Sequence, residues 1–140
     1  MNSNKKTAKM DRKVILSTLW IFAMFNYIYA DIMGLMDSSV LKKILTGSVG
    51  DLQITQGFLL GAAVLMETAI VMVLLSRVLK YRANRWANII AGVIHTAAVF
   101  LSMFVGTGAP APYYIFHIAI EVACTLFIVW YAWTWPKQEA

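Results

Sequence analysis

The sequence is poor in cysteine, proline and charged residues. It contains one cysteine, Cys124, and three prolines among 140 residues. A single cysteine excludes an intrachain disulfide and says nothing about the redox compartment. Charged residues make up 14% of the chain, against about 25% in a typical soluble domain. The sequence also lacks a phosphate loop, a nucleophile elbow, zinc-ligand spacing and a haem-attachment motif, so no catalytic or cofactor class follows from a motif.

What the chain has instead is apolar residues, which make up 60% of it. A soluble domain of this size could not bury that much apolar surface, which indicates a lipid environment. Four segments have roughly the 20 apolar residues that cross a bilayer, at about 14–36, 54–76, 86–105 and 113–135. We therefore predict an all-α fold: one transmembrane domain over 1–140, built as an antiparallel bundle of four membrane-spanning helices.

The connection between the first two spans has its own helical pattern, at about 39–46. Val40, Leu41 and Ile44 share one face of it, while two lysines share the other. Ser38 or Ser39 is expected to cap this helix, and Gly47 to end it. Such a pattern is typical of a helix that lies in the membrane interface.

The basic residues predict the orientation of the spans. With both termini inside, ten of the twelve lysines and arginines lie inside, and only Lys42 and Lys43 lie outside. We therefore expect a multi-pass protein of the cell (inner) membrane with both termini cytoplasmic. The net charge of +5 is interpreted as this topology signal, so no nucleic-acid partner is expected. The first span is too long for a signal-peptide core and is expected to be retained.

Five ionisable residues lie inside the apolar segments: Asp31, Glu67, His95, His117 and Glu121. A charge at the centre of a span costs roughly 2.5–3.5 kcal/mol, so such residues usually face the interior of the bundle. By helical rise, Glu67, His95 and Glu121 fall near the midplane, and Asp31 and His117 fall farther outward. The depths predict two layers, each with a carboxylate and an imidazole.

Polar residues on the first and fourth spans follow helical spacing. Tyr114, His117, Glu121 and then Cys124 or Thr125 recur every three or four residues, and Tyr27 precedes Asp31 by four. Tyr27, Tyr114, Cys124 and Thr125 are therefore expected to line the candidate site. Lipid cannot hydrogen-bond to these groups, so the stripe is expected to face the interior.

The residues are compatible with three kinds of chemistry. Di-metal bundles usually carry Glu-x-x-His on two helices, which this chain lacks, so no metal ligand is assigned. Buried carboxylates beside histidines also suit a proton relay or an acid–base pair. The structural alternative is that Glu67 and Glu121 are protonated and hydrogen-bond across helices. No cofactor is assigned, and whether the protein is an enzyme stays open.

Three functions follow from these alternatives. The leading hypothesis is an intramembrane site that binds or acts on a small apolar or amphipathic molecule. The second is a proton-coupled transporter that works as a homo-oligomer, specifically a dimer. The third is a non-catalytic subunit or assembly factor of a membrane complex.

Small and polar residues elsewhere are interpreted as structural. Gly57-x-x-x-Gly61 and the four-residue spacing of Ala83, Ala87 and Ala91 match close-approach motifs, and we expect both to serve packing within the bundle. Asn84, Arg85 and Asn88 surround Trp86, and we expect them to cap and anchor the third span.

Two stretches carry a family resemblance. Leu75-Ser-Arg-Val-Leu-Lys-Tyr-Arg-Ala-Asn-Arg-Trp-Ala-Asn88 and Tyr114-Ile-Phe-His-Ile-Ala-Ile-Glu121, with Tyr29-Ala-Asp31 and Met66-Glu67, resemble an uncharacterised bacterial family of small four-helix membrane proteins. That resemblance implies a fold and no activity. The stretch from Gly61 to Leu75 is also similar, more distantly, to the second span of DoxX-like proteins. A DoxX-like relationship would imply a bundle associated with redox or quinone-linked membrane complexes.

Overall fold

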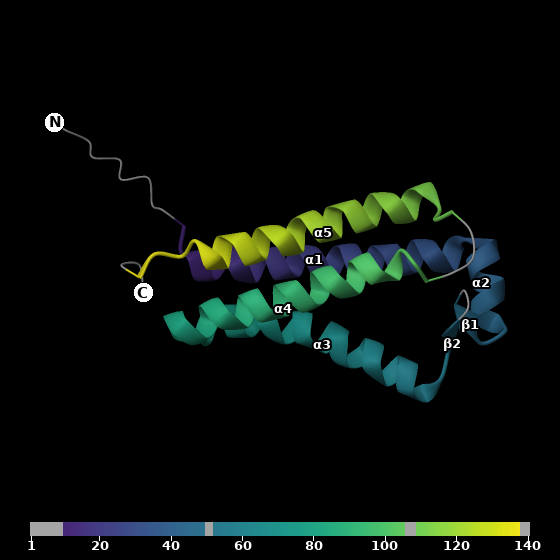
Figure 1. The fold of residues 1–140 in the computed structure, drawn as a ribbon, viewed down its shortest axis with the longest axis horizontal. Helices are drawn as coiled ribbons and strands as arrows, with labels where there is room; N and C mark the ends of the chain where they lie inside the picture. The colour runs from purple at the N-terminus through teal and green to yellow at the C-terminus, as the bar shows by residue number, and fades with distance from the viewer. Residues whose placement is uncertain (1–9, 50–51, 106–108, 138–140) are drawn as a thin grey trace.

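The computed structural model describes residues 10–49, 52–105 and 109–137 (Figure 1). Lys5, Lys6 and Lys9 of the basic N-terminal arm lie outside these ranges. The elements are α1 (Arg12–Met36), α2 (Ser38–Leu45), β1 (Ser48–Val49), β2 (Leu52–Gln53), α3 (Gln56–Val78), α4 (Tyr81–Ser102) and α5 (Pro112–Trp133). The four long helices are all long and apolar enough to cross a membrane. The chain is thus an all-α, multi-pass membrane protein, as its apolar segments predict.

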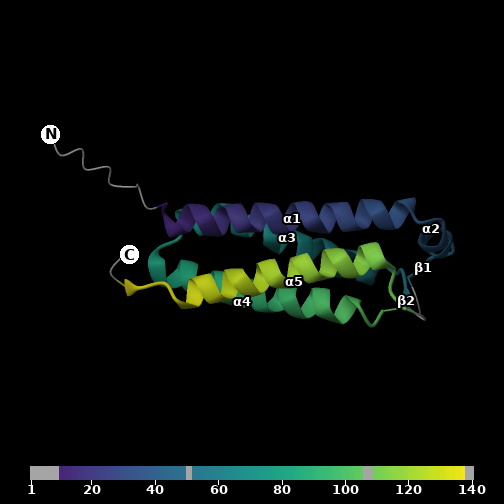
Figure 2. The same cartoon turned by 90° about the horizontal axis from the view of Figure 1, so that it is seen from above.

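The four long helices form an antiparallel bundle in which α1 packs against α3 and α5, and α4 packs against α5 (Figures 1 and 2). The contact between α3 and α4 is the smallest of the four neighbouring contacts. We call the end where α1 begins and α5 finishes the terminal end, and the opposite end the α2 end. In Figure 1, α3 diverges from the other helices toward the α2 end.

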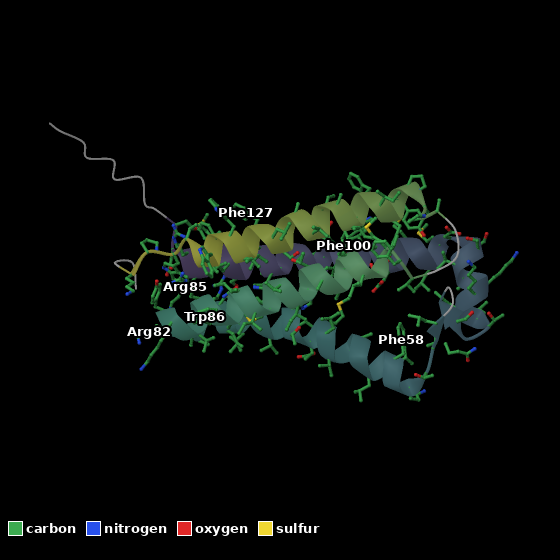
Figure 3. The ribbon with its side chains drawn as sticks, viewed as in Figure 1. Phe58, Arg82, Arg85, Trp86, Phe100 and Phe127 are labelled. Carbon is green, nitrogen blue, oxygen red and sulfur yellow. The ribbon has the colours of Figure 1, made fainter. Side chains whose placement is uncertain are left out.

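The third span starts earlier than its apolar pattern predicts, at Tyr81 rather than Trp86. Leu79 and Lys80 suffice to reverse the chain after α3, and no proline or glycine between Tyr81 and Trp86 interrupts the helix. Arg85 therefore lies on the helix at the terminal end (Figure 3), where its Nη2 donates to the Trp133 carbonyl at 2.9 Å. The long arginine side chain keeps its charge at the edge of the bundle.

The short helix α2 begins and ends at residues that hold its backbone groups. Its cap is Asp37, rather than Ser38 or Ser39 as the sequence suggested. The Asp37 carboxylate accepts a hydrogen bond from the Ser39 amide at 2.9 Å and from the Ser39 hydroxyl at 2.7 Å. A carboxylate at this position satisfies an unpaired amide and complements the helix dipole. After α2, Gly47 has a φ of +80°, which favours glycine, and the β1–β2 hairpin follows.

The buried core occupies the terminal half of the bundle. On the α2 side, α1 buries no residue beyond Tyr27, α3 none beyond Ala69 and α4 none beyond His95. Only α5 has a buried residue nearer the α2 end, Ile118. The bundle is consequently packed tightly at one end and loosely at the other.

The glycine motif on α3 does not serve packing within the chain, contrary to the expectation. A Cβ added at Gly61 would have no atom within 4 Å, and one at Gly57 would meet only Thr55 Oγ1, at 3.8 Å. Both glycines lie in the part of α3 that diverges from the bundle. The tightest helix approach is instead at Gly92 on α4, where an added Cβ would lie 2.6 Å from Val129 Cγ2.

Candidate functional site

His95 lies at the centre of the bundle, where the packed half meets the loosely packed half. Its side chain is 1% exposed. The ring stacks on Tyr27 of α1, with centroids 5.6 Å apart and an interplanar angle of 15°. It meets the ring of Trp20 edge-on, at 5.2 Å. The imidazole is therefore fixed by two aromatic rings from α1.

The polar contact of His95 assigns its tautomer. His95 Nε2 lies 2.9 Å from Thr68 Oγ1 on α3. The single hydroxyl hydrogen of Thr68 is donated to the Leu65 carbonyl at 2.6 Å, as helical threonines commonly do. The Thr68 oxygen must then accept, so Nε2 carries the proton and donates. This leaves Nδ1 as the basic nitrogen of a neutral ring.

Two buried polar groups beside His95 have atoms without a hydrogen-bond partner among the described residues: the Tyr27 hydroxyl and Oε1 of Glu121. The two side chains are 4% and 5% exposed. Tyr27 interacts electrostatically with Glu121 and Cys124. Buried polar atoms nearly always have a partner, so two unpaired atoms close together mark a place where a further group would be favourable.

The remaining predicted lining residues on α5 are paired. Cys124 is 7% exposed, and its thiol donates weakly to the Leu19 carbonyl at 3.5 Å. The Thr125 hydroxyl donates to the Glu121 carbonyl at 3.0 Å and accepts from Thr96 at 2.7 Å. These contacts fix α5 against α1 and α4. None of them involves the side-chain carboxyl of Glu121.

The predicted outer layer is only partly assembled. Asp31 is exposed, one turn outward of Tyr27, although it still interacts electrostatically with Glu121. His117 is half-buried, and its Nδ1 has no partner among the described residues. Tyr114 turns instead to α4, where its hydroxyl donates to Ser102 Oγ at 2.9 Å.

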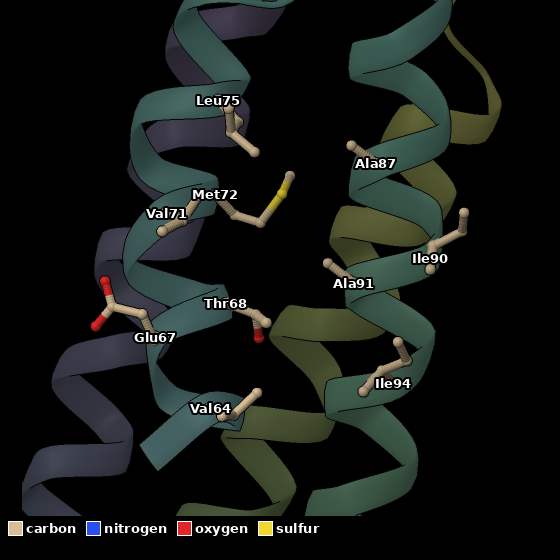
Figure 4. Close-up of a pocket in the computed structure, with 10 residues that line it drawn as sticks. All are labelled: Val64, Glu67, Thr68, Val71, Met72, Leu75, Ala87, Ile90, Ala91 and Ile94. Carbon is tan, nitrogen blue, oxygen red and sulfur yellow. The ribbon is translucent and has the colours of Figure 1, made fainter. Parts of the chain in front are cut away.

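Glu67 does not join the other candidates. It lies at the rim of an apolar groove of about 430 Å³ between α3 and α4. In Figure 4 its carboxylate points away from α4, whereas Thr68 points toward it. Glu67 is exposed and, in the part of the chain that the structure describes, has no hydrogen-bonding or ionic partner. The depth of Glu67 matched the midplane layer, but depth does not fix the direction in which a residue faces.

A second polar group, absent from the predicted set, lies nearer the terminal end. Trp20 Nε1 donates to Asn88 Oδ1 at 2.7 Å, and Ser76 Oγ donates to the same oxygen at 3.1 Å. Asn88 Nδ2 donates to Asn84 Oδ1 at 2.7 Å, and Asn84 Nδ2 donates to the Ser76 carbonyl at 2.6 Å. All four side chains are fully buried. Asn84 and Asn88 thus join three helices rather than capping α4, and their four-residue spacing was the signal for a shared face.

The candidate residues do not make a metal site. No group of three or more histidine, cysteine, aspartate or glutamate side chains in the described ranges is placed to hold a metal ion. His95 and Glu121 are brought together with Tyr27 in the interior, while Glu67 faces outward. We call Tyr27, His95 and Glu121 the central cluster.

Comparison with known proteins identifies the family of the chain. The profile of a family of unknown function, DUF6326, matches residues 6–140. No curated protein and no solved structure matches the chain. The distant DoxX-like relationship accordingly stays a prediction. Because the profile covers nearly the entire sequence, the chain belongs to the DUF6326 family, as the resemblance to an uncharacterised membrane family predicted.

Proposed function

We propose that this protein binds a small apolar or amphipathic molecule inside the bilayer, at the central cluster. The observation that carries the proposal is the pair of unpartnered, buried polar atoms, Tyr27 Oη and Glu121 Oε1. A buried polar group without a partner costs free energy, and lipid chains cannot supply a hydrogen bond. A hydroxyl group can accept from the Tyr27 hydroxyl and donate to Glu121 Oε1, so a molecule that carries one would suit both atoms.

The surroundings of the cluster suit an amphipathic molecule. On the α2 side of Tyr27 and His95, α1 and α4 bury no residue, so their apolar side chains there are open to contact with an apolar molecule. Aromatic faces from Trp20 and Tyr27 line the approach to His95. A mainly apolar site with few polar groups is the usual composition of small-molecule sites.

The site lies within a protein that we propose to be in the cell (inner) membrane, with both termini cytoplasmic. The support is the distribution of basic residues, ten of twelve on the terminal side of the spans. The α2 end, where the bundle is loosely packed, would then face the outer leaflet.

The test is ligand retention in protein extracted with its native lipid by a styrene–maleic acid polymer. Solvent extraction and mass spectrometry should detect a small molecule enriched with the wild-type protein. We expect Glu121→Met and Tyr27→Phe to lower its retention roughly five- to thirtyfold, since each removes one polar contact worth roughly 1–2 kcal/mol. Both substitutions nearly preserve volume, so the fold should be retained.

Glu67→Met is the matched control, because Glu67 is an exposed carboxylate on α3 whose side chain points away from α4 (Figure 4). It should retain the molecule at the wild-type level. A wild-type protein that carries no enriched molecule, or variants that lose expression without any change in retention, would instead support a structural role for Tyr27 and Glu121.

A further inference from the structure

One face of α3 is exposed along most of the helix. It comprises Gly57, Leu60, Gly61, Val64, Glu67 and Val71, which recur at three- and four-residue spacing and therefore form a continuous strip. All six residues are exposed. The strip borders the apolar groove between α3 and α4, and Val64, Glu67 and Val71 belong to both. We call it the α3 face.

The α3 face combines two features that a lipid-facing surface does not need. Gly61 permits another backbone to approach closely, since nothing lies within 4 Å of its added Cβ. Glu67 lies near the middle of α3 and has no partner among the described residues. Ionisable side chains within spans almost always face a bundle interior or a cavity, and hydrocarbon offers no partner for a carboxyl.

We propose that the α3 face is the interface with a second copy of this chain, with the two Glu67 side chains paired at the two-fold axis. Two-fold symmetry places both carboxyls at the same depth in the membrane. An unrelated helix would need a polar group of its own at that depth. A carboxylic acid donates one hydrogen bond and accepts others, so two carboxyls that share a proton satisfy each other. Gly57 and Gly61, about three and two turns away, let the two α3 helices approach closely on the α2 side of this contact. The residues of the central cluster lie on α1, α4 and α5, so the α3 face shares no residue with that cluster.

Cysteine cross-linking in native vesicles tests which residues meet. The sole cysteine is replaced by Cys124→Ala, and single cysteines are placed on the α3 face (Leu60→Cys, Val64→Cys, Glu67→Cys and Val71→Cys). Oxidation should then give covalent dimers at these positions. Leu59→Cys is the matched control beside Leu60, since Leu59 is 48% exposed and is not three or four residues from any member of the α3 face. It should give few dimers or none.

Photobleaching of single labelled molecules in vesicles tests the two proposed contacts. We expect Glu67→Leu and Gly61→Ile each to weaken the dimer, roughly three- to twentyfold for one intramembrane contact. Glu67→Gln should keep it, because paired amides also donate and accept. Gly34→Ile is the control for added bulk at a half-buried glycine whose added Cβ meets no atom within 4 Å. A protein that stays monomeric at all densities, equal cross-linking at Leu59→Cys, or cross-links only to a different protein would overturn the proposal.

Discussion

At the scale of single residues, Gly92 has the least room for a side chain among the described glycines. It brings α4 against α5, and an added Cβ would also lie 3.3 Å from the Thr125 carbonyl oxygen. The backbone oxygen cannot move without shifting α5. The polar contacts that flank Gly92, from Thr96 to Thr125 on one side and around Asn88 on the other, depend on this close approach.

We therefore expect Gly92→Ala to destabilise the fold by about 1–3 kcal/mol, the usual cost of overpacking a tight interior. Thermal unfolding in detergent, followed by tryptophan fluorescence, measures the change. Gly34→Ala is the control, because its added Cβ meets no atom within 4 Å. Equal unfolding temperatures for Gly92→Ala and the wild-type protein would contradict the close approach.

The candidate residues could be named from the sequence, but only some could be oriented. Helical spacing on the fourth span correctly grouped Glu121 with Cys124 and Thr125, and all three are buried. Glu67 stands alone among apolar residues on the second span, so no pattern there indicated which face it occupies. Its outward direction follows from how α3 packs on α1, and that is a property of the assembled bundle.

At the scale of elements, the junction of α1 and α2 depends on one carboxylate. Asp37 ends α1 and caps α2. Hydrogen bonds from the Ser39 hydroxyl, and next from the Ser39 amide, lower the pKa of the Asp37 carboxyl below its ordinary value. The ionised form therefore stabilises the junction above the ordinary aspartate pKa of about 3.9, and that contribution is lost as the pH falls through the lower, folded-state pKa.

We expect the first turn of α2 to loosen at acid pH in the wild-type protein and not in Asp37→Asn, which keeps an uncharged cap. Hydrogen exchange of the α2 amides, compared between the two proteins at each pH, measures this difference. The comparison at equal pH removes the intrinsic pH dependence of exchange. An identical pH response of the two proteins would contradict a role for the charge.

The limits of helices were predicted least well where polar and apolar residues mix. The third span was expected to begin at Trp86 because hydropathy falls off before it, whereas α4 continues back to Tyr81. Asn84 and Asn88 lowered the apolar signal there, yet both are fully buried because they bond to each other and to Trp20 and Ser76. The polar side chains of Asn84 and Asn88 thus suggested that the span had not yet begun, whereas hydrogen bonding allows both to be buried inside the helix bundle.

At the scale of the whole molecule, the proposed orientation can be tested independently of function. In the Cys124→Ala protein, Thr46→Cys lies next to α2 and Lys80→Cys lies in the α3–α4 turn. With cytoplasmic termini, an impermeant maleimide should label Thr46→Cys in intact cells and Lys80→Cys only after the membrane is opened. The reverse pattern would place the termini outside.

The residues that bond to the buried polar side chains of α4 precede it in the sequence, which matters for membrane insertion during synthesis. α4 is the least apolar of the four spans. Its Asn88 bonds to Trp20 and Ser76, and its His95 contacts Tyr27 and Thr68. All four of these partners precede α4, so they have already been synthesised when it leaves the ribosome. The span that is hardest to insert alone is therefore the one whose fully buried polar side chains have partners that are made first. Thr96, Ser102 and Arg85, at its less buried positions, wait for α5.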